Sequence, residues 1–185
     1  MKRLMIDMDD VICGGGFLKL VNTFLKTNYT QEDISTYYIQ DLIPVEKKEE
    51  WITFFSKENV YAYVQMLPDA KQVIEKLNKE YETYIITDYI YPECPNYSGE
   101  NLRNKFCYLY KELPFLAPKQ FIFGAVKDFV QADIKIDDIP RHLEKASEQK
   151  LLFTAYHNKN ITQEELQTRG ITRVNNWKEI EKRLL

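Results

Sequence analysis

The sequence is poor in cysteine, in histidine and in long apolar runs. Its 185 residues include three cysteines and two histidines. The three cysteines, an odd number without metal-type spacing, favour reduced thiols and a cytoplasmic location. No stretch approaches the roughly 18 apolar residues of a membrane span, and Asp7 ends the first apolar run too early for a signal peptide. We therefore expect a soluble protein with no membrane partner.

The sequence also lacks an excess of basic charge. It has 25 lysines and arginines against 28 aspartates and glutamates, for a net charge of −3. A surface that binds a polynucleotide normally shows clustered positive charge, so this composition gives no support for a polynucleotide partner. A mononucleotide needs only a pocket and is not excluded. The oligomeric state stays open at this level.

Glycine is scarce, and three of the six glycines form one run, Gly14-Gly15-Gly16. Because glycine loses more backbone freedom on folding than other residues, the run predicts a loop or a hinge. Apolar residues then recur at helical spacing over 17–25 and again over 45–59, with no clear strand signal between 17 and 66. We interpret residues 14–70, called the cap segment below, as a small helical cap inserted into a core made of 1–13 and 71–185.

The remainder of the chain alternates between short apolar runs and helical patterns. The predicted strands cover 4–6, 83–86, 121–123, 132–136, 151–153 and 172–174, and the predicted helices start at Pro68, near Asn101, after Pro140, at Thr162 and at Trp177. Strands that alternate with helices are typical of a parallel sheet covered on both faces. The predicted fold is therefore a doubly wound α/β core with a helical cap after the first strand.

Polar residues follow four of the predicted strands. Asp7 and Asp9 follow the first, Thr87-Asp88 the second, Lys127 the third and Asp137-Asp138 the fourth. In open parallel sheets, ligands bind outside the carboxyl ends of the strands. Each of these features alone is common at strand exits, helix starts or on the surface. Their occurrence at four successive strand ends predicts one shared site.

These residue types suit phosphoryl transfer. Two carboxylates two residues apart, Asp7 and Asp9, can face the same way from an extended segment, so that one attacks phosphorus while the other transfers a proton. Bringing Asp137 and Asp138 beside them requires a cation because like charges repel. Oxygen-only ligands favour Mg²⁺. Lys127 and Thr87 would donate to phosphate oxygens.

The order of these residues resembles a known superfamily. Asp7-Met8-Asp9-Asp10-Val11, Ile85-Ile86-Thr87, Lys127 and Ile136-Asp137-Asp138 are similar to the four motifs of the haloacid dehalogenase superfamily. The resemblance implies that Asp7 forms an aspartyl phosphate, that Asp9 is the general acid and base, and that Thr87, with Asp88 beside it, and Lys127 bind phosphate. It also implies that Mg²⁺ is held by Asp7, the Asp9 backbone oxygen and Asp138, with Asp137 beside them.

A closer likeness is to the 5'(3')-deoxyribonucleotidases. It rests on Met66–Ala70, on Ala132–Asp138, and on Leu152–Asn158 with Asn176-Trp177. The likeness implies hydrolysis of 5'(3')-(deoxy)nucleoside monophosphates. Departures from the pattern are Asp10 in place of a glycine, the glycine run where an aromatic residue usually faces the base, Asp88 in place of a serine, and Ile139 in place of a basic residue.

Other interpretations stay open beside this one. The chain could hydrolyse another small phosphate ester on the same fold. Receiver domains also combine acidic residues, Thr and Lys at strand ends, but their acidic pair comes first and their phosphorylated Asp later. A binding module without activity is a third alternative. Most cap aromatics are expected to form core, and His157, which lies outside the four motifs, is expected to have a structural role.

Overall fold

The computed structural model describes residues 1–34 and 36–185. Its centre is a six-stranded parallel sheet with the order β5-β4-β1-β6-β7-β8. The strands are β1 (Arg3–Ile6), β4 (Glu82–Thr87), β5 (Phe121–Phe123), β6 (Ala132–Asp137), β7 (Ala146–Phe153) and β8 (Ile171–Val174). This arrangement confirms the predicted doubly wound α/β class and all six predicted core strands.

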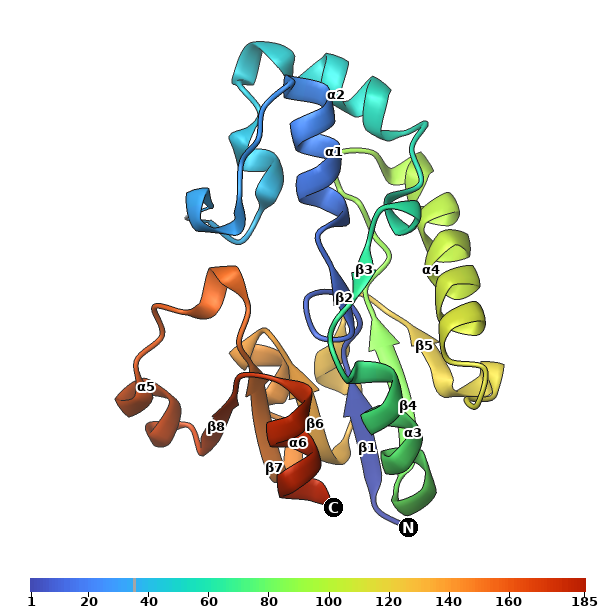
Figure 1. Cartoon of the computed structure of the whole chain (residues 1–185), viewed down its shortest axis with the longest axis vertical. Helices are drawn as coiled ribbons and strands as arrows, with labels where there is room; N and C mark the ends of the chain where they lie inside the picture. Colours follow the sequence, from blue (N-terminus) through green and yellow to red (C-terminus); the bar gives the residue numbers. More distant parts are fainter. Residues whose placement is uncertain (35) are drawn as a thin grey trace.

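Alternate side chains of the strands enter separate cores on the two faces of the sheet. Leu4 and Ile6 of β1 belong to the main core, whereas Met5 points to the opposite face. The main core is completed by three helices, α3 (Ala70–Glu80), α4 (Ser98–Glu112) and α6 (Trp177–Leu184). Helices α3 and α6 lie side by side in front of the sheet (Figure 1).

The second face is covered more thinly than predicted. Its only described α-helix is α5 (Gln163–Thr168), whose Leu166 packs on Leu152 of β7. The predicted helix after Pro140 is wrong, because that segment forms a 3-10 turn, η8 (Pro140–Leu143), and β7 already begins at Ala146. The first residues of β7 are polar and partly exposed. The apolar run at 151–153 therefore predicted only the end of this strand.

The cap segment lies above the carboxyl ends of the central strands (Figure 1). Two short antiparallel strands, β2 (Cys13–Gly14) and β3 (Gln65–Met66), carry the chain into and out of it. Between them are α1 (Gly16–Leu25), α2 (Lys48–Phe55) and the 3-10 turns η1 (Gln31–Asp33), η2 (Ile39–Leu42), η3 (Val45–Lys47) and η4 (Val60–Ala62). Strand β3 was missed because two residues produce no alternating pattern.

The glycine run is not a simple loop or hinge. Gly14 lies in β2, Gly15 has a positive φ of 85°, and Gly16 is the first residue of α1. A Cβ on Gly16 would lie 2.7 Å from the carbonyl oxygen of Val60. Gly15 thus allows the backbone turn, and Gly16 allows α1 to approach η4 closely. Among the described residues, no helix is long and apolar enough to cross a bilayer.

Candidate active site

The predicted site residues meet at the carboxyl ends of three adjacent strands. The chain leaves β1 toward β4 on one side, and leaves β6 toward β7 on the other. Such a switch point opens a crevice at the sheet edge. Asp7 follows β1, Thr87 ends β4 and Asp137 ends β6, and all three are buried. Asp7, Asp9, Asp88, Lys127 and Asp138 line one pocket.

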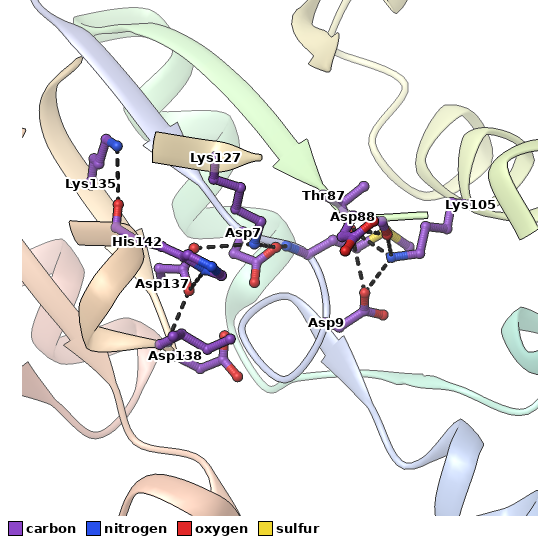
Figure 2. A network of polar contacts seen from close by, with 12 residues as sticks. Asp7, Asp9, Thr87, Asp88, Lys105, Lys127, Lys135, Asp137, Asp138 and His142 are labelled. Atoms are coloured by element: carbon purple, nitrogen blue, oxygen red, sulfur yellow. Dashed lines mark hydrogen bonds and ion pairs between the residues drawn. The ribbon is translucent and has the colours of Figure 1, made fainter. Parts of the chain in front are cut away.

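Lys127 connects two of the predicted carboxylates. Its Nζ lies 2.7 Å from Oδ1 of Asp7 and 3.2 Å from Oδ2 of Asp137 (Figure 2). Burial disfavours the ammonium, but the two carboxylates outweigh burial and raise the pKa of Lys127. His142 Nδ1 lies 3.1 Å from the other oxygen of Asp137. Lys127 is therefore a fixed positive charge beside Asp7.

Three carboxylates form a group that fits a hard cation. Oxygens of Asp7, Asp137 and Asp138 lie within 4.8 Å of one another, and all three residues are buried. Burial, together with neighbouring carboxylates, raises the pKa of Asp138 well above its usual value, and burial raises that of Asp7. A divalent cation would relieve this repulsion, and an oxygen-only set suits Mg²⁺. The predicted contribution of Asp9 to the metal is its backbone oxygen, and its carboxylate does not belong to this group.

His157 lies at the site, where a purely structural role was expected. Its Nε2 is 2.6 Å from Oδ2 of Asp138, and Asn158 donates to the Asp138 carbonyl at 2.9 Å. Burial lowers the pKa of His157 to about 4, so its ring is neutral at pH 7. Asp10 completes a second group with Asp138 and His157. His157 and Asn158 thus contact the side chain and the backbone carbonyl of Asp138.

Asp10 occupies a backbone position that suits glycine. Its φ is 55°, in the left-handed region. Burial, then the charges of Asp9 and Asp7, raise the pKa of Asp10 to about 7. The glycine typical of the deoxyribonucleotidases at this position would carry neither the backbone strain nor the charge.

Asp9 points away from the carboxylates of Asp137 and Asp138, toward Lys105 of α4 (Figure 2). Its Oδ2 accepts from Lys105 Nζ at 2.5 Å, and its Oδ1 accepts from the hydroxyl of Tyr61 at 2.7 Å. Burial opposes ionisation of Asp9, but Lys105 and the Tyr61 hydroxyl outweigh it and hold its pKa below the usual value. Both oxygens of Asp9 are thus fixed, one by the core and one by the cap segment.

Lys105 was missed by the sequence interpretation. Its side chain is buried, and its Nζ donates to Thr87 Oγ1 at 2.6 Å and to the carbonyl of Asp88. A signal was present, because Asn101, Lys105 and Leu109 occur at four-residue spacing and all three are buried on α4. A lysine on the apolar face of a helix is seldom buried without a partner.

Thr87 and Asp88 differ in their surroundings: Thr87 is buried, whereas Asp88 lines the pocket. Thr87 Oγ1 lies 3.3 Å from Oδ2 of Asp9, beside the ammonium of Lys105. The exposed carboxylate of Asp88 accepts from the backbone N–H of Ile90 at 2.8 Å. The Asp88 side chain is therefore tied to its own loop, and its predicted role in binding phosphate stays a prediction.

The aromatic residues of the cap segment divide into core and pocket. Trp51 and Phe55 are buried and pack on each other with ring centroids 5.3 Å apart. Aromatic side chains from several elements line the pocket: Phe17, Tyr37, Tyr38, Tyr61, Tyr91 and Tyr156. The expectation that most cap aromatics form core is confirmed, since Trp51, Phe54, Phe55 and Tyr61 belong to the main core or pack against it, whereas Tyr37 and Tyr38 line the pocket. Phe17 directly follows the glycine run and supplies an aromatic ring close to the stretch where one had seemed absent.

The fold is that of the haloacid dehalogenase-like hydrolases. A hydrolase of this family from Streptococcus pneumoniae aligns with a TM-score of 0.53 and 13% sequence identity, over 100% of this chain and 99% of the other. A protein from Burkholderia xenovorans named as a candidate haloacid dehalogenase-like hydrolase aligns with a TM-score of 0.54 and 11% sequence identity, over 97% of this chain and 94% of the other. At these identities the likeness defines the fold alone.

Sequence comparison identifies the family within this class. The pattern of the family described as 5' nucleotidase, deoxy (pyrimidine), cytosolic type C protein (NT5C) matches residues 1–185. A 5'(3')-deoxyribonucleotidase of Bacillus subtilis is 27% identical over 100% of this chain and 99% of its own length. A Staphylococcus aureus protein named as a candidate 5'(3')-deoxyribonucleotidase is 31% identical over 100% of this chain and 96% of its own length. The chain belongs to the NT5C family and is a phosphoric monoester hydrolase.

Proposed function

We propose that this protein is a Mg²⁺-dependent phosphatase that hydrolyses 5'(3')-deoxynucleoside monophosphates through a phosphorylated Asp7. The observation that carries the proposal is the position of Asp7 beside both a fixed cation and a carboxylate group. Lys127 lies 2.7 Å from its carboxylate, and carboxylate oxygens of Asp137 and Asp138 lie within 4.8 Å of it. The first supplies a positive charge and the second a place for a metal ion beside the same oxygen atoms.

The reaction has two balanced steps. An oxygen of the Asp7 carboxylate forms a bond to phosphorus, the bond from phosphorus to the nucleoside oxygen breaks, and Asp9 gives its proton to that oxygen. A water molecule then gives a proton to Asp9 and attacks phosphorus. The bond between phosphorus and Asp7 breaks, which releases inorganic phosphate and restores the Asp7 carboxylate and the protonated Asp9.

Charges already in the site support each step. Lys127 orients Asp7, and the Met8 N–H donates to the same oxygen at 2.7 Å. Lys105, which donates to Thr87 at 2.6 Å, and Thr87 itself would donate to the phosphate oxygens that gain charge. When phosphate binds, Lys105 would donate to phosphate instead of to Asp9. The pKa of Asp9 would then rise, so that Asp9 could carry the proton that the first step needs.

Asp7 and Asp138 would hold Mg²⁺ together with the backbone oxygen of Asp9, and Asp137 would lie beside them. A bound Mg²⁺ would neutralise charge on the phosphate oxygens and bring phosphate close to Asp7. Asn158 and His157 would fix the orientation of Asp138, as outer partners of ligands commonly do.

The aromatic lining of the pocket supports a nucleotide substrate. Phe17, Tyr37 and Tyr91 offer ring surfaces next to the phosphate residues, and the relatives are named as deoxyribonucleotidases. A stacked base contributes roughly 1–3 kcal/mol in single-strand binders. That range corresponds to a gain in affinity of about fivefold to 150-fold over a sugar phosphate without a base.

The test compares kcat/KM for dUMP and dTMP with that for ribose 5-phosphate, which keeps a sugar and a phosphate but lacks the base. We expect an advantage of at least about fivefold for the nucleotides. Equal values would show that the base is not recognised, and the protein would then be a phosphatase for other small phosphate esters.

A further inference from the structure

Tyr61 is a residue of the cap segment that reaches the proton-transfer group of the core. It belongs to the 3-10 turn η4, and its side chain is buried. Its hydroxyl donates to Oδ1 of Asp9 at 2.7 Å. A buried tyrosine hydroxyl normally finds a partner, but this partner is the carboxylate that the proposed reaction uses for acid and base catalysis.

The position of Tyr61 is fixed at three points. The side chain of Asn59 accepts from the Tyr61 backbone N–H at 3.0 Å. The ring lies near α4, with Lys105 Nζ 5.6 Å from its centroid and the ring of Tyr108 5.9 Å away. Gly16 lets η4 lie close against α1, because a Cβ at this position would fall 2.7 Å from the carbonyl oxygen of Val60. The hydroxyl therefore has little freedom to leave Asp9 while the cap segment keeps this position.

The two oxygens of Asp9 have different partners. Oδ2 contacts Lys105 and Thr87, which belong to the core and face the phosphate site. Oδ1 contacts Tyr61, from the cap segment. If Tyr61 lost its hydroxyl, the carboxylate would be held from one side only and could rotate about the bond to its Cβ. The orientation of Asp9 thus depends on the cap segment.

We infer that Tyr61 is a positioning residue for proton transfer, which orients Asp9 toward the leaving alcohol and links this orientation to the seating of the cap segment. The inference rests on the proposed role of Asp9. It predicts a defect that depends on the leaving group, because p-nitrophenolate leaves without a proton whereas a nucleoside alkoxide needs one.

The experiment measures kcat/KM of Tyr61→Phe for dUMP and for p-nitrophenyl phosphate. This quantity reports the steps up to the first irreversible one, so slow release of phosphate from Asp7 does not affect it. We expect a loss of about tenfold with dUMP, as for one hydrogen bond to a charged group, and a change of less than about twofold with p-nitrophenyl phosphate. Retained activity with the second substrate also shows that the variant is folded.

Two further variants separate the possible outcomes. Tyr63→Phe makes the same change on an exposed tyrosine of the cap segment, whose hydroxyl contacts Glu58, and should behave like the parent with both substrates. Asp9→Asn tests the proposed function itself and should lose far more activity with dUMP than with p-nitrophenyl phosphate. If Asp9→Asn lacks this selectivity, the proposed role of Asp9 fails. If Asp9→Asn shows it but Tyr61→Phe loses both activities equally, or neither, the inference about Tyr61 is overturned.

Discussion

Lys105 Nζ lies 2.5 Å from Oδ2 of Asp9, although 96 residues separate the two in the chain. The same ammonium donates to Thr87 at 2.6 Å. A single buried cation from α4 therefore connects the proposed proton-transfer group with the proposed phosphate-binding threonine. Proton transfer by Asp9 and phosphate binding by Thr87 were predicted from separate motifs. Both residues contact Lys105, which lies outside both motifs.

Replacing Lys105 should weaken catalysis strongly. Lys105→Met keeps the length and apolar stem of the side chain but removes the charge that would face phosphate. We expect kcat/KM for dUMP to fall by about 100-fold or more. This is the usual effect of removing one hydrogen-bond donor that stabilises negative charge in the transition state. Lys111→Met, on an exposed lysine of the same helix, is the control. A Lys105→Met enzyme within threefold of the parent would remove Lys105 from the site.

The site residues that could be predicted from the sequence are those that directly follow a predicted strand. Asp7, Thr87, Lys127 and Asp137 meet because parallel strands end at one sheet edge, so the position along the chain was sufficient. Lys105, Tyr61 and His157 are different. Each reaches the site from a helix or turn whose place depends on tertiary packing, and a single lysine, tyrosine or histidine is common in such elements. The core strands were predictable because each contains a buried apolar run. The polar start of β7 and the two-residue strand β3 contain no such run and were missed.

Gly16→Ala should destabilise the protein. The added Cβ would lie 2.7 Å from a backbone oxygen of Val60, so η4 or α1 must shift. We expect about 1–3 kcal/mol lower stability in urea unfolding, the usual range for overpacking. Gly99→Ala in α4 is the matched control, since its Cβ would meet no atom within 4 Å, and it should be neutral or stabilising. Equal stability of the two variants would show that the contact at Gly16 is relaxed in solution.

Asp10→Gly should stabilise the metal-free protein. Glycine adopts the φ of 55° at this position without strain, and it removes a buried carboxyl from beside Asp9 and Asp7. We expect a gain of about 1 kcal/mol and a higher Tm in EDTA. Asp10→Asn, which keeps the shape but not the charge, separates the two causes. A lower Tm for Asp10→Gly would mean that the Asp10 carboxyl makes a net stabilising contact.

Metal removal should abolish activity. Asp7, Asp137 and Asp138 crowd negative charge into one buried group, so EDTA should stop turnover of dUMP and Mg²⁺ should restore it. Asp138→Asn should raise the Mg²⁺ concentration for half-maximal activity by more than tenfold, in line with loss of one ligand. Asp133→Asn, at the opposite end of β6 and bonded to the Arg3 N–H, should leave that concentration unchanged. Full turnover in metal-free buffer would contradict the proposed metal site.

The central claim is that Asp7 carries the phosphoryl group, and trapping that group tests it most directly. The enzyme is mixed with ³²P-labelled dUMP, quenched in acid within the first turnover, reduced with borohydride and digested, and the modified peptide is identified by mass spectrometry. We expect modification at Asp7, and we expect the Asp7→Asn variant to be folded, unlabelled and inactive. Phosphate carried by any other residue, or Asp7→Asn activity within tenfold of the parent, would contradict it.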